Sequence, residues 1–256
     1  MQDSHKNEKR VKELYEKYPY PSRQNATDKK VKNFVKWVSS IFGENFDYWK
    51  GKNVLELGCG TGELANGLAL CGANVYAIDF SSSSIKKAKE LSKKLGTKVK
   101  FEEKNILEFK SEKKYDIVIA LGSLHHTINA KKGFENGINC LKKDGLIVIG
   151  LYNKYSRFRQ RVRRLILGIF CGKNIEKRIE IGKRLFGAME SREQEADKYG
   201  QVWESYHSVS EILRWFSKNN IDFIASKPKF EKPLIDEIKW FLSKKGAFFV
   251  MVGKAK

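Results

Sequence analysis

The chain from residue 53 onward alternates two kinds of segment. Short apolar runs bounded by turn residues are followed by longer stretches whose apolar residues recur at helical spacing. This alternation is typical of repeated strand and helix units, which build a parallel sheet covered by helices on both faces. Seven runs predict strands, at residues 53–58, 74–79, 98–103, 115–121, 146–152, 221–226 and 247–253. We therefore expect a three-layer α/β fold with a seven-stranded, mostly parallel sheet.

Two amphipathic segments precede the first predicted strand. The first has apolar residues at helical spacing until two prolines end it, at Val11, Leu14, Tyr15, Tyr18, Pro19 and Pro21. The second runs through residues 31–42. We expect residues 1–45 to form a helical lid. Its aromatic residues Tyr15, Tyr18 and Tyr20 either close over a ligand or brace the first helix on the edge of the sheet.

Residues 153–206 interrupt the alternation between the fifth and sixth predicted strands. A helical stripe of apolar residues occurs there, at Phe158, Val162, Leu165, Ile166, Ile169 and Phe170. Five arginines crowd its flanks, at positions 157, 159, 161, 163 and 164. We expect an inserted helical cap that separates a core domain, residues 46–152, from the end of the sheet, residues 207–256. The arginines either cover a buried apolar stripe with their alkyl stems or hold an anionic acceptor.

The overall composition fits one α/β domain with modest additions, since the chain has 256 residues. Its formal charge of +20 is unusual. Such a field attracts RNA or an anionic membrane surface without sequence-specific contacts. Lysines are strewn along the whole chain, however, together with many Asn and Ile residues, as the coding bias of an AT-rich genome would produce. Charge alone therefore leaves a nucleic acid, a membrane and no polyanion at all as alternatives.

The cysteine pattern and the chain's start indicate a cytoplasmic protein. The first ten residues are polar, and no run of about eighteen apolar residues occurs, so we expect neither a signal peptide nor a membrane span. The cysteines, at positions 59, 71, 140 and 171, are far apart and have no histidine at ligand spacing. This pattern predicts neither a disulfide framework nor a metal site.

A glycine-rich turn follows the first predicted strand, with Gly58, Gly60 and Gly62 in the spacing G-x-G-x-G. A dinucleotide-binding fingerprint would require its third glycine at position 63, where Glu63 stands. Glu56, just before the turn, would also repel a pyrophosphate. A ligand with an ammonium group and no phosphate suits this loop better, because glycines let such a ligand lie against the backbone. S-adenosylmethionine is such a ligand.

The ends of the next two predicted strands offer contacts for the rest of that molecule. Asp79 ends the second strand about 20 residues beyond the first glycine, where a carboxylate can accept both ribose hydroxyl protons. Phe80 offers an apolar face to the adenine, and Asn105 and Ile106 follow the third strand. Taken singly, Asp79 could instead cap the following helix and Ile106 could belong to the core.

Residues 53–152 resemble the common core of class I, Rossmann-like methyltransferases that depend on S-adenosylmethionine, and resemble most the metal-independent branch acting on small molecules and some tRNA bases. The resemblance implies a cofactor set of Glu56, Gly58, Gly60 and Gly62 at the methionine part, Asp79 at the ribose, and Asn105 with Ile106 at the adenine. Asn105 stands where the family usually has Asp. The segment LKKDGLIVIGLYN is similar to the family's turn into the fifth strand. Tyr20, Phe80 and Leu121 complete the expected cofactor-binding set.

The methyl acceptor should lie beyond the fourth and fifth predicted strands, because ligands of open α/β sheets bind beyond the carboxyl ends of the strands. The motifs for methylating an exocyclic base amine or cytosine C5 are missing there. His125 and His126 remain, of which one can point into the cleft. We select His126 as a candidate general base, against a role in shaping the turn. Tyr152 is a second candidate, as hydrogen-bond donor or pocket wall.

Three functions fit these patterns. The first is transfer of a methyl group from S-adenosylmethionine to a small-molecule acceptor in a pocket built by the cap and lid, where the arginines would accommodate an anionic acceptor. The second is methylation of tRNA or rRNA, with the basic cap holding phosphates. The third is a cofactor-binding protein without catalysis. We expect the first.

Overall fold

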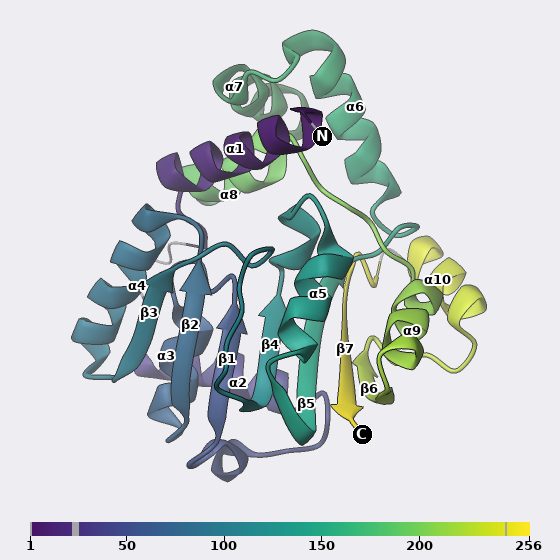
Figure 1. The fold of residues 1–256 in the computed structure, drawn as a ribbon. Coiled ribbons are helices and arrows are strands. Elements are labelled where there is room, and N and C mark those ends of the chain that lie inside the picture. The colour runs from purple at the N-terminus through teal and green to yellow at the C-terminus, as the bar shows by residue number, and fades with distance from the viewer. Residues whose placement is uncertain (1, 22–25, 244) are drawn as a thin grey trace.

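The computed structural model describes residues 2–21, 26–243 and 245–256, and its centre is a seven-stranded sheet (Figure 1). The strand order is β3-β2-β1-β4-β5-β7-β6. The strands are β1 (Asn53–Leu57), β2 (Asn74–Asp79), β3 (Val99–Glu103), β4 (Tyr115–Leu121), β5 (Leu141–Tyr152), β6 (Ile221–Lys227) and β7 (Phe248–Ala255). Strands β1 to β5 pair in parallel, and β7 runs antiparallel to both β5 and β6. The predicted seven-stranded, mostly parallel sheet is confirmed.

Both faces of the sheet are buried, which explains why the strands are continuous apolar runs. In β4, Ile117 and Ile119 pack into one core while Val118 and Ala120 pack into the other. The same alternation divides β1, β5 and β7 between the two cores. Because successive side chains of a strand point to opposite faces, each central strand supplies apolar residues to both layers.

Six helices cover the two faces (Figure 1). One face is covered by α2 (Asp28–Ser39), α3 (Glu63–Leu70) and α4 (Ser82–Leu95), and the other by α5 (Ala130–Ile138), α9 (Val209–Lys218) and α10 (Pro233–Leu242). The predicted lid, residues 1–45, therefore has two parts with different positions. Its second helix, α2, packs against α3 with Val35 and Val38 fully buried, so it belongs to a layer of the sheet.

The remaining α-helices and a short π-helix lie beyond the carboxyl ends of the strands (Figure 1). They are α1 (Gln2–Lys17), α6 (Phe158–Cys171), α7 (Ile175–Phe186), α8 (Arg192–Glu195) and the short π-helix η3 (Ala196–Gly200). In a small core of their own, Leu14 of α1 packs with Ile179 and Ala196. We call α6 to η3 the cap.

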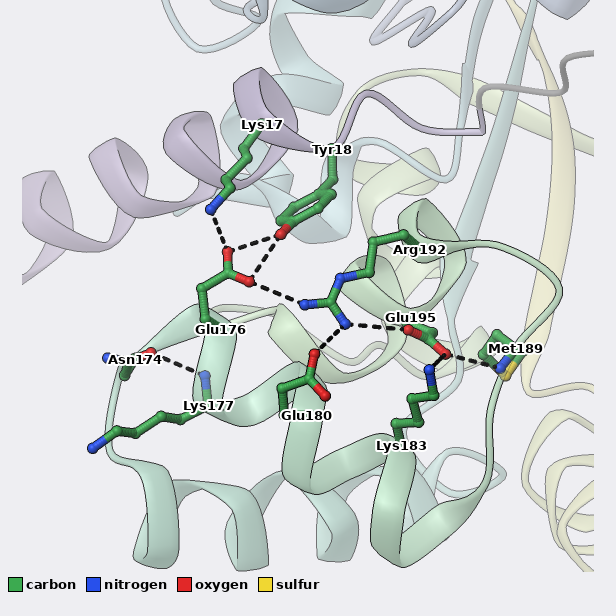
Figure 2. A network of polar contacts seen from close by, with 10 residues as sticks. All are labelled: Lys17, Tyr18, Asn174, Glu176, Lys177, Glu180, Lys183, Met189, Arg192 and Glu195. Atoms are coloured by element: carbon green, nitrogen blue, oxygen red, sulfur yellow. Dashed lines mark hydrogen bonds and ion pairs between the residues drawn. The ribbon is translucent and has the colours of Figure 1, made fainter.

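Polar contacts fix α1 between the sheet and the cap. The carboxylate of Glu16 accepts hydrogen bonds from the backbone N–H groups of Ser82 and Ser83 at the start of α4, at 2.6 and 3.0 Å. Figure 2 shows how the end of α1 is attached to the cap. Glu176 of α7 accepts hydrogen bonds from Tyr18 and Lys17 and forms an ion pair with Arg192. Since a carboxylate near a helix N-terminus is stabilised by the exposed N–H groups, Glu16 anchors α1 on α4.

The orientation of α6 differs from the expectation. Its apolar stripe is exposed, with Leu165 65% and Ile169 72% exposed. The buried side of the helix instead carries Leu167, with Arg164 turned inward toward the carboxylate of Glu204. Of the two alternatives considered for the arginines, a buried apolar stripe covered by their alkyl stems does not fit this orientation, because the stripe is exposed and Arg164 pairs with the buried Glu204.

Phe134 of α5 tests the stability of the core. It is fully buried between Trp215 and Phe216, with ring centroids 5.6 and 5.8 Å away. We expect Phe134→Ala to lower the free energy of unfolding by about 3 to 5 kcal/mol, since it removes buried area and leaves a cavity. Chemical denaturation measures this change. In the control Phe170→Ala, at a side chain that is 71% exposed, stability should hardly change. Equal losses in both variants would contradict the described core.

Candidate active site

A cavity of about 510 Å³ lies at the carboxyl ends of β1, β2, β4 and β5. Parallel pairing brings these strand ends to the same edge of the sheet, as Leu57 pairs with Ile78 and Leu121 with Gly150. Helix α1, helix α2 and η3 contribute the remaining walls. The cavity is lined by eleven of the twelve site residues expected from the sequence, namely Tyr20, Glu56, Gly58, Gly60, Asp79, Phe80, Asn105, Ile106, Leu121, His126 and Tyr152.

The glycine-rich turn is shaped by its contact with the aromatic N-terminal segment. The Tyr20 carbonyl accepts a hydrogen bond from the backbone N–H of Thr61 and lies against Gly60, where a Cβ atom would collide with it. Gly60 also has a φ of +52°, which favours glycine. Glycine is therefore required at this position both for the turn and for the close approach of Tyr20.

Gly62 does not line the cavity, so its contact with the cofactor stays a prediction. It caps α3, and its Cα faces Ala88 and Phe101, where an added Cβ would lie 2.7 Å from the Ala88 Cβ. The third glycine of the motif thus allows α3 to pack closely against α4.

Glu56 forms the acidic floor of the cavity. Its side chain is buried, and its Oε2 atom has no hydrogen-bond partner among the residues that the structure describes. Burial raises the pKa of this carboxyl well above its ordinary value, and the nearby carboxylates of Glu63 and Asp79 raise it further. A cationic ligand would relieve this unfavourable charge, since buried carboxylates require a partner.

Asp79 joins three segments around the cavity. Its Oδ2 atom accepts from the Gly60 N–H at 2.9 Å, and its Oδ1 atom accepts from the Ser81 N–H at 3.0 Å. Burial raises the pKa of Asp79 to about 6, although these backbone hydrogen bonds oppose the rise. Ser81 in turn caps α4 through its Oγ atom, which accepts from the Ser84 N–H.

The far end of the cavity contains Asn105 together with a residue that the sequence did not suggest. The Asn105 side chain donates to the Glu8 carboxylate of α1 at 2.7 Å and accepts from the Leu107 N–H at 2.9 Å. Glu8 itself lines the cavity, as do Phe80 and Ile106. The Asn in place of the usual Asp therefore has a structural partner, because an amide can donate to a carboxylate where a second carboxylate would repel it.

The two neighbouring histidines differ in their exposure to the cavity. His126 lines the cavity, whereas His125 is fully buried outside its wall and stacks on Tyr152 with ring centroids 3.7 Å apart. Burial lowers the pKa of His125 well below its ordinary value. The choice between the two histidines, which the sequence left open, is thus decided in favour of His126.

His126 lies beside Asp197 of the cap, with 4.0 Å between its Nε2 and the Asp197 Oδ1. Burial lowers the pKa of His126, while Asp197 and Glu204 oppose the shift. Asp197 is held by a hydrogen bond from the Tyr15 hydroxyl at 2.9 Å, and that hydroxyl also accepts from Gln201. The His126 Nδ1 atom is buried and has no partner among the described residues.

The cap closes over Tyr152 through an ion-paired cluster. The Arg157 guanidinium lies 3.4 Å from the centre of the Tyr152 ring. Glu204 pairs with Arg157 at 3.4 Å and with Arg164 at 2.8 Å. Burial alone would raise the pKa of Glu204, but the two arginines hold it below its ordinary value. The pKa of Tyr152 is raised by burial, so its phenol stays protonated at neutral pH.

Of the three aromatic residues considered for the lid, Tyr15 and Tyr20 line the cavity, while Tyr18 contacts the cap through Glu176 (Figure 2).

Asp197 and Glu8 line the cavity but were not predicted from the sequence. Neither lies in a motif, and both are brought to the cavity by helices outside the sheet. The only signal in the sequence was that both residues lie in charged segments. Many other acidic residues of the chain share this property, so it does not single these two out.

Comparison with known proteins identifies the family. The family model described as a methyltransferase domain matches residues 49–220. A ubiquinone biosynthesis O-methyltransferase of Rickettsia canadensis is 36% identical over 104 residues, which are 41% of this chain and 44% of that protein. The chain therefore aligns with less than half the length of this relative.

Two solved structures share the fold. Magnesium protoporphyrin IX methyltransferase from Synechocystis PCC 6803, with bound S-adenosylmethionine, has a TM-score of 0.55 at 15% identity, covering 90% of this chain and 79% of that one. An S-adenosylmethionine-dependent methyltransferase from Clostridium acetobutylicum has a TM-score of 0.56 at 15% identity, covering 93% and 96%. The chain belongs to the methyltransferase domain family. Its Rossmann-like fold is that of solved methyltransferases that bind S-adenosylmethionine.

The contribution of Asp79 to cofactor binding can be measured with S-adenosylhomocysteine. We expect Asp79→Ala to weaken binding by about 1.5 to 3 kcal/mol, the range for a hydrogen bond to a charged group. Asp116→Ala is the matched control, because Asp116 also accepts from a backbone N–H, that of Asn53 at 2.8 Å, but outside the cavity. Calorimetry compares the two variants. Unchanged affinity in Asp79→Ala would leave Asp79 with a purely structural role.

The raised pKa of Asp79 predicts a pH dependence. The ribose hydroxyls donate to the charged carboxylate, so protonation of Asp79 as the pH falls through about 6 should weaken S-adenosylhomocysteine binding. Above this pH the affinity should level off. Titrations of the wild type and of Asp79→Asn across this range measure the effect. A step near pH 6 that persists in Asp79→Asn would assign the titration to another group.

Proposed function

We propose that this chain transfers the methyl group of S-adenosylmethionine to a hydroxyl group of a small-molecule acceptor. One observation supports this most directly. The same cavity holds an acidic floor, Glu56 and Asp79, and a buried histidine, His126, beside a carboxylate. The floor suits the cationic cofactor and the histidine suits an acceptor that must lose a proton. The name of the Rickettsia relative, an O-methyltransferase, favours oxygen as the accepting atom.

The proposed cofactor contacts follow from the chemistry of the cavity wall. Glu56 would bind the ammonium group of the methionine part, because its Oε2 atom lacks a partner among the described residues. Asp79 would accept from the ribose hydroxyls. Phe80 and Ile106 would contact the adenine faces. The remaining contacts come from Gly58, Gly60, Asn105, Tyr20 and Leu121 in the same cavity.

When bound, the cofactor supplies a methyl group already activated by its positive sulfur. That methyl group would pass to the acceptor oxygen, which must lose its proton. His126, which lines the cavity, would take the hydroxyl proton, with Asp197 Oδ1 4.0 Å from its Nε2 atom. Its lowered pKa keeps the ring neutral and able to accept a proton at pH 7. Asp197 then stabilises the imidazolium that forms.

Tyr152 would position the acceptor. Its pKa is raised by burial, so the hydroxyl donates a hydrogen bond rather than acting as a base. The Arg157 guanidinium fixes the ring from above. Positioning of this kind supplies much of the rate in a transfer whose electrophile is already activated.

RNA methylation is the second candidate. The arginines considered for holding phosphates include Arg157 and Arg164, and both pair with the buried Glu204. Arginines engaged in this way are poor phosphate ligands, because releasing them would leave a buried carboxylate without a partner. The small-molecule acceptor is therefore the better supported one.

We place the reaction in the cytoplasm. All four cysteines, Cys59, Cys71, Cys140 and Cys171, are free thiols, and three of them are buried. Unpaired thiols are typical of a reducing compartment.

The proposal is tested by incubating the protein with S-adenosylmethionine and a panel of phenols, alcohols, amines and thiols. Formation of S-adenosylhomocysteine and of a methyl ether from a hydroxyl acceptor is the expected result. Bulk tRNA is the parallel arm. Methylation of tRNA with no turnover of any small acceptor would overturn the proposal, and so would tight cofactor binding without turnover in either arm.

The general base is tested by His126→Asn. We expect kcat to fall by about 10² to 10⁴, the usual contribution of general base catalysis, with unchanged S-adenosylhomocysteine affinity. His207→Asn is the control, because His207 also contacts a carboxylate, Glu211 at 3.0 Å, but does not line the cavity. Loss of activity in His207→Asn to the same extent would assign the effect to stability instead of proton transfer.

Asp197→Asn gives a separate signature in the pH profile. Asp197 raises the pKa of His126 against the effect of burial, so its neutralisation should move the acidic limb of the kcat profile to lower pH. The plateau should also fall, because the imidazolium loses its counterion. An acidic limb that stays in place in Asp197→Asn would exclude His126 as the titrating base.

A further inference from the structure

The outer side of α6 is an apolar surface that the methyltransferase reaction does not use. Phe158, Val162, Leu165 and Ile169 recur at intervals of four, three and four residues, which places them along one line of the helix. All four are exposed, and Leu165 and Ile169 are 65% and 72% exposed. The buried side of α6, with Leu167, is the opposite side.

Helix α10 extends this surface. The Phe158 ring at the start of α6 meets the Phe241 ring of α10 edge-on, with centroids 6.4 Å apart. Phe241 and its neighbours Ile238 and Leu242 are also exposed. The two helices come together at this end of α6 in Figure 1. We call Phe158, Val162, Leu165, Ile169, Ile238, Phe241 and Leu242 the α6–α10 surface.

Arginines flank this surface on both sides. A rotation of about 100° per residue puts the exposed Arg159 on one side of the apolar line and the exposed Arg161 on the other, whereas the half-buried Arg163 lies over the Phe186 ring of α7, 5.3 Å from its centroid. None of these three forms an ion pair with a described carboxylate, in contrast to Arg157 and Arg164, which turn inward to Glu204. The arginines of α6 are thus divided between a neutralised inner set and an outer set that borders exposed apolar side chains.

We infer that the α6–α10 surface binds to an anionic phospholipid bilayer at its interface. An amphipathic helix with apolar residues flanked by arginines lies in the plane of a membrane, with its apolar side among the acyl chains and its cations at the lipid headgroups. Each such arginine adds attraction to anionic lipids, and the formal charge of +20 acts in the same direction. Within the described residues no helix is long and apolar enough to cross a membrane, and interfacial binding requires none.

Two other occupants fit the surface less well. A second copy of the chain, related by twofold symmetry, would bring the outer arginines of both copies together, and like charges oppose such a contact. RNA would neutralise the arginines but leave the aliphatic side chains of Leu165 and Ile169 without suitable contacts, because its outer surface is phosphate and sugar.

The surface adjoins the active site. Phe158 directly follows Arg157, whose guanidinium lies over the Tyr152 ring in the cavity wall. Binding at this surface therefore brings the acceptor side of the cavity close to the lipid headgroups.

The test is co-sedimentation of the purified protein with vesicles of phosphatidylcholine alone and of phosphatidylcholine mixed with an equal amount of phosphatidylglycerol. We expect binding to the anionic vesicles that decreases with added salt, and weaker binding to the neutral ones. Replacing Leu165 and Ile169 together with Gln should weaken binding by at least about tenfold, because two apolar side chains no longer enter the bilayer. Replacing Arg159 and Arg161 with Gln should weaken binding to anionic vesicles alone.

Matched controls distinguish binding through this surface from nonspecific binding to vesicles. Phe158→Gln lies within the α6–α10 surface, whereas Phe46→Gln makes the same change on the short helix η1 (Phe46–Trp49), before β1 at the opposite end of the sheet. Only the first should reduce vesicle binding. In the double variant Leu165→Gln, Ile169→Gln, turnover of a water-soluble acceptor should stay at the wild-type level. Vesicle binding is therefore measured independently of the proposed reaction.

Three results would overturn the inference. They are lack of binding to anionic vesicles, equal binding by the surface variants and the wild type, and a concentration-dependent dimer in sedimentation equilibrium that the Leu165→Gln and Ile169→Gln changes abolish. The last result would assign the surface to self-association.

Discussion

The buried carboxylate of Asp79 is the contact on which the geometry of the cavity depends. It joins the end of β2 to the glycine-rich turn through Gly60 and to the start of α4 through Ser81. Ser81 also donates a hydrogen bond from its hydroxyl to the Tyr15 carbonyl, so α1 is held at the same point. Burial makes this carboxylate costly, as its raised pKa indicates, and a ligand with hydroxyl donors would stabilise its charged form.

The same requirement for partners organises the cap. Glu204 is buried and pairs with Arg157 and Arg164, which determines the side that α6 presents to the interior. The inner side of the helix is therefore partly polar, and its apolar line faces outward. Asp197, at the end of the cap, is carried to His126 by the same packing. The need to neutralise the buried Glu204 thus connects the proposed base, the cavity wall at Tyr152 and the exposed surface of α6.

Much of the site could be predicted because its residues are adjacent to strand ends. Glu56, Asp79 and Leu121 lie at or near the ends of parallel strands, and a parallel sheet brings such ends together whatever the details of packing. Gly62 faces α4 instead of the cavity, and a glycine motif does not reveal whether a missing side chain makes room for a ligand or for a helix. Glu8 and Asp197 were not found, since each reaches the cavity from a helix outside the sheet.

The seven strands, their mostly parallel arrangement and the edge of the sheet where the cavity lies could all be predicted from the order of the residues. These features follow from local periodicity and from the burial of the strands on both faces, because both can be recognised directly in the order of apolar residues. Only the tertiary structure decided that His126 faces the cavity and His125 does not, that α2 joins the sheet layer, and that the apolar line of α6 points outward. Each of these features depends on which residue, distant in the sequence, packs against a buried charge or an apolar face. Helical periodicity predicts that a helix has an apolar face, but it does not predict what covers that face.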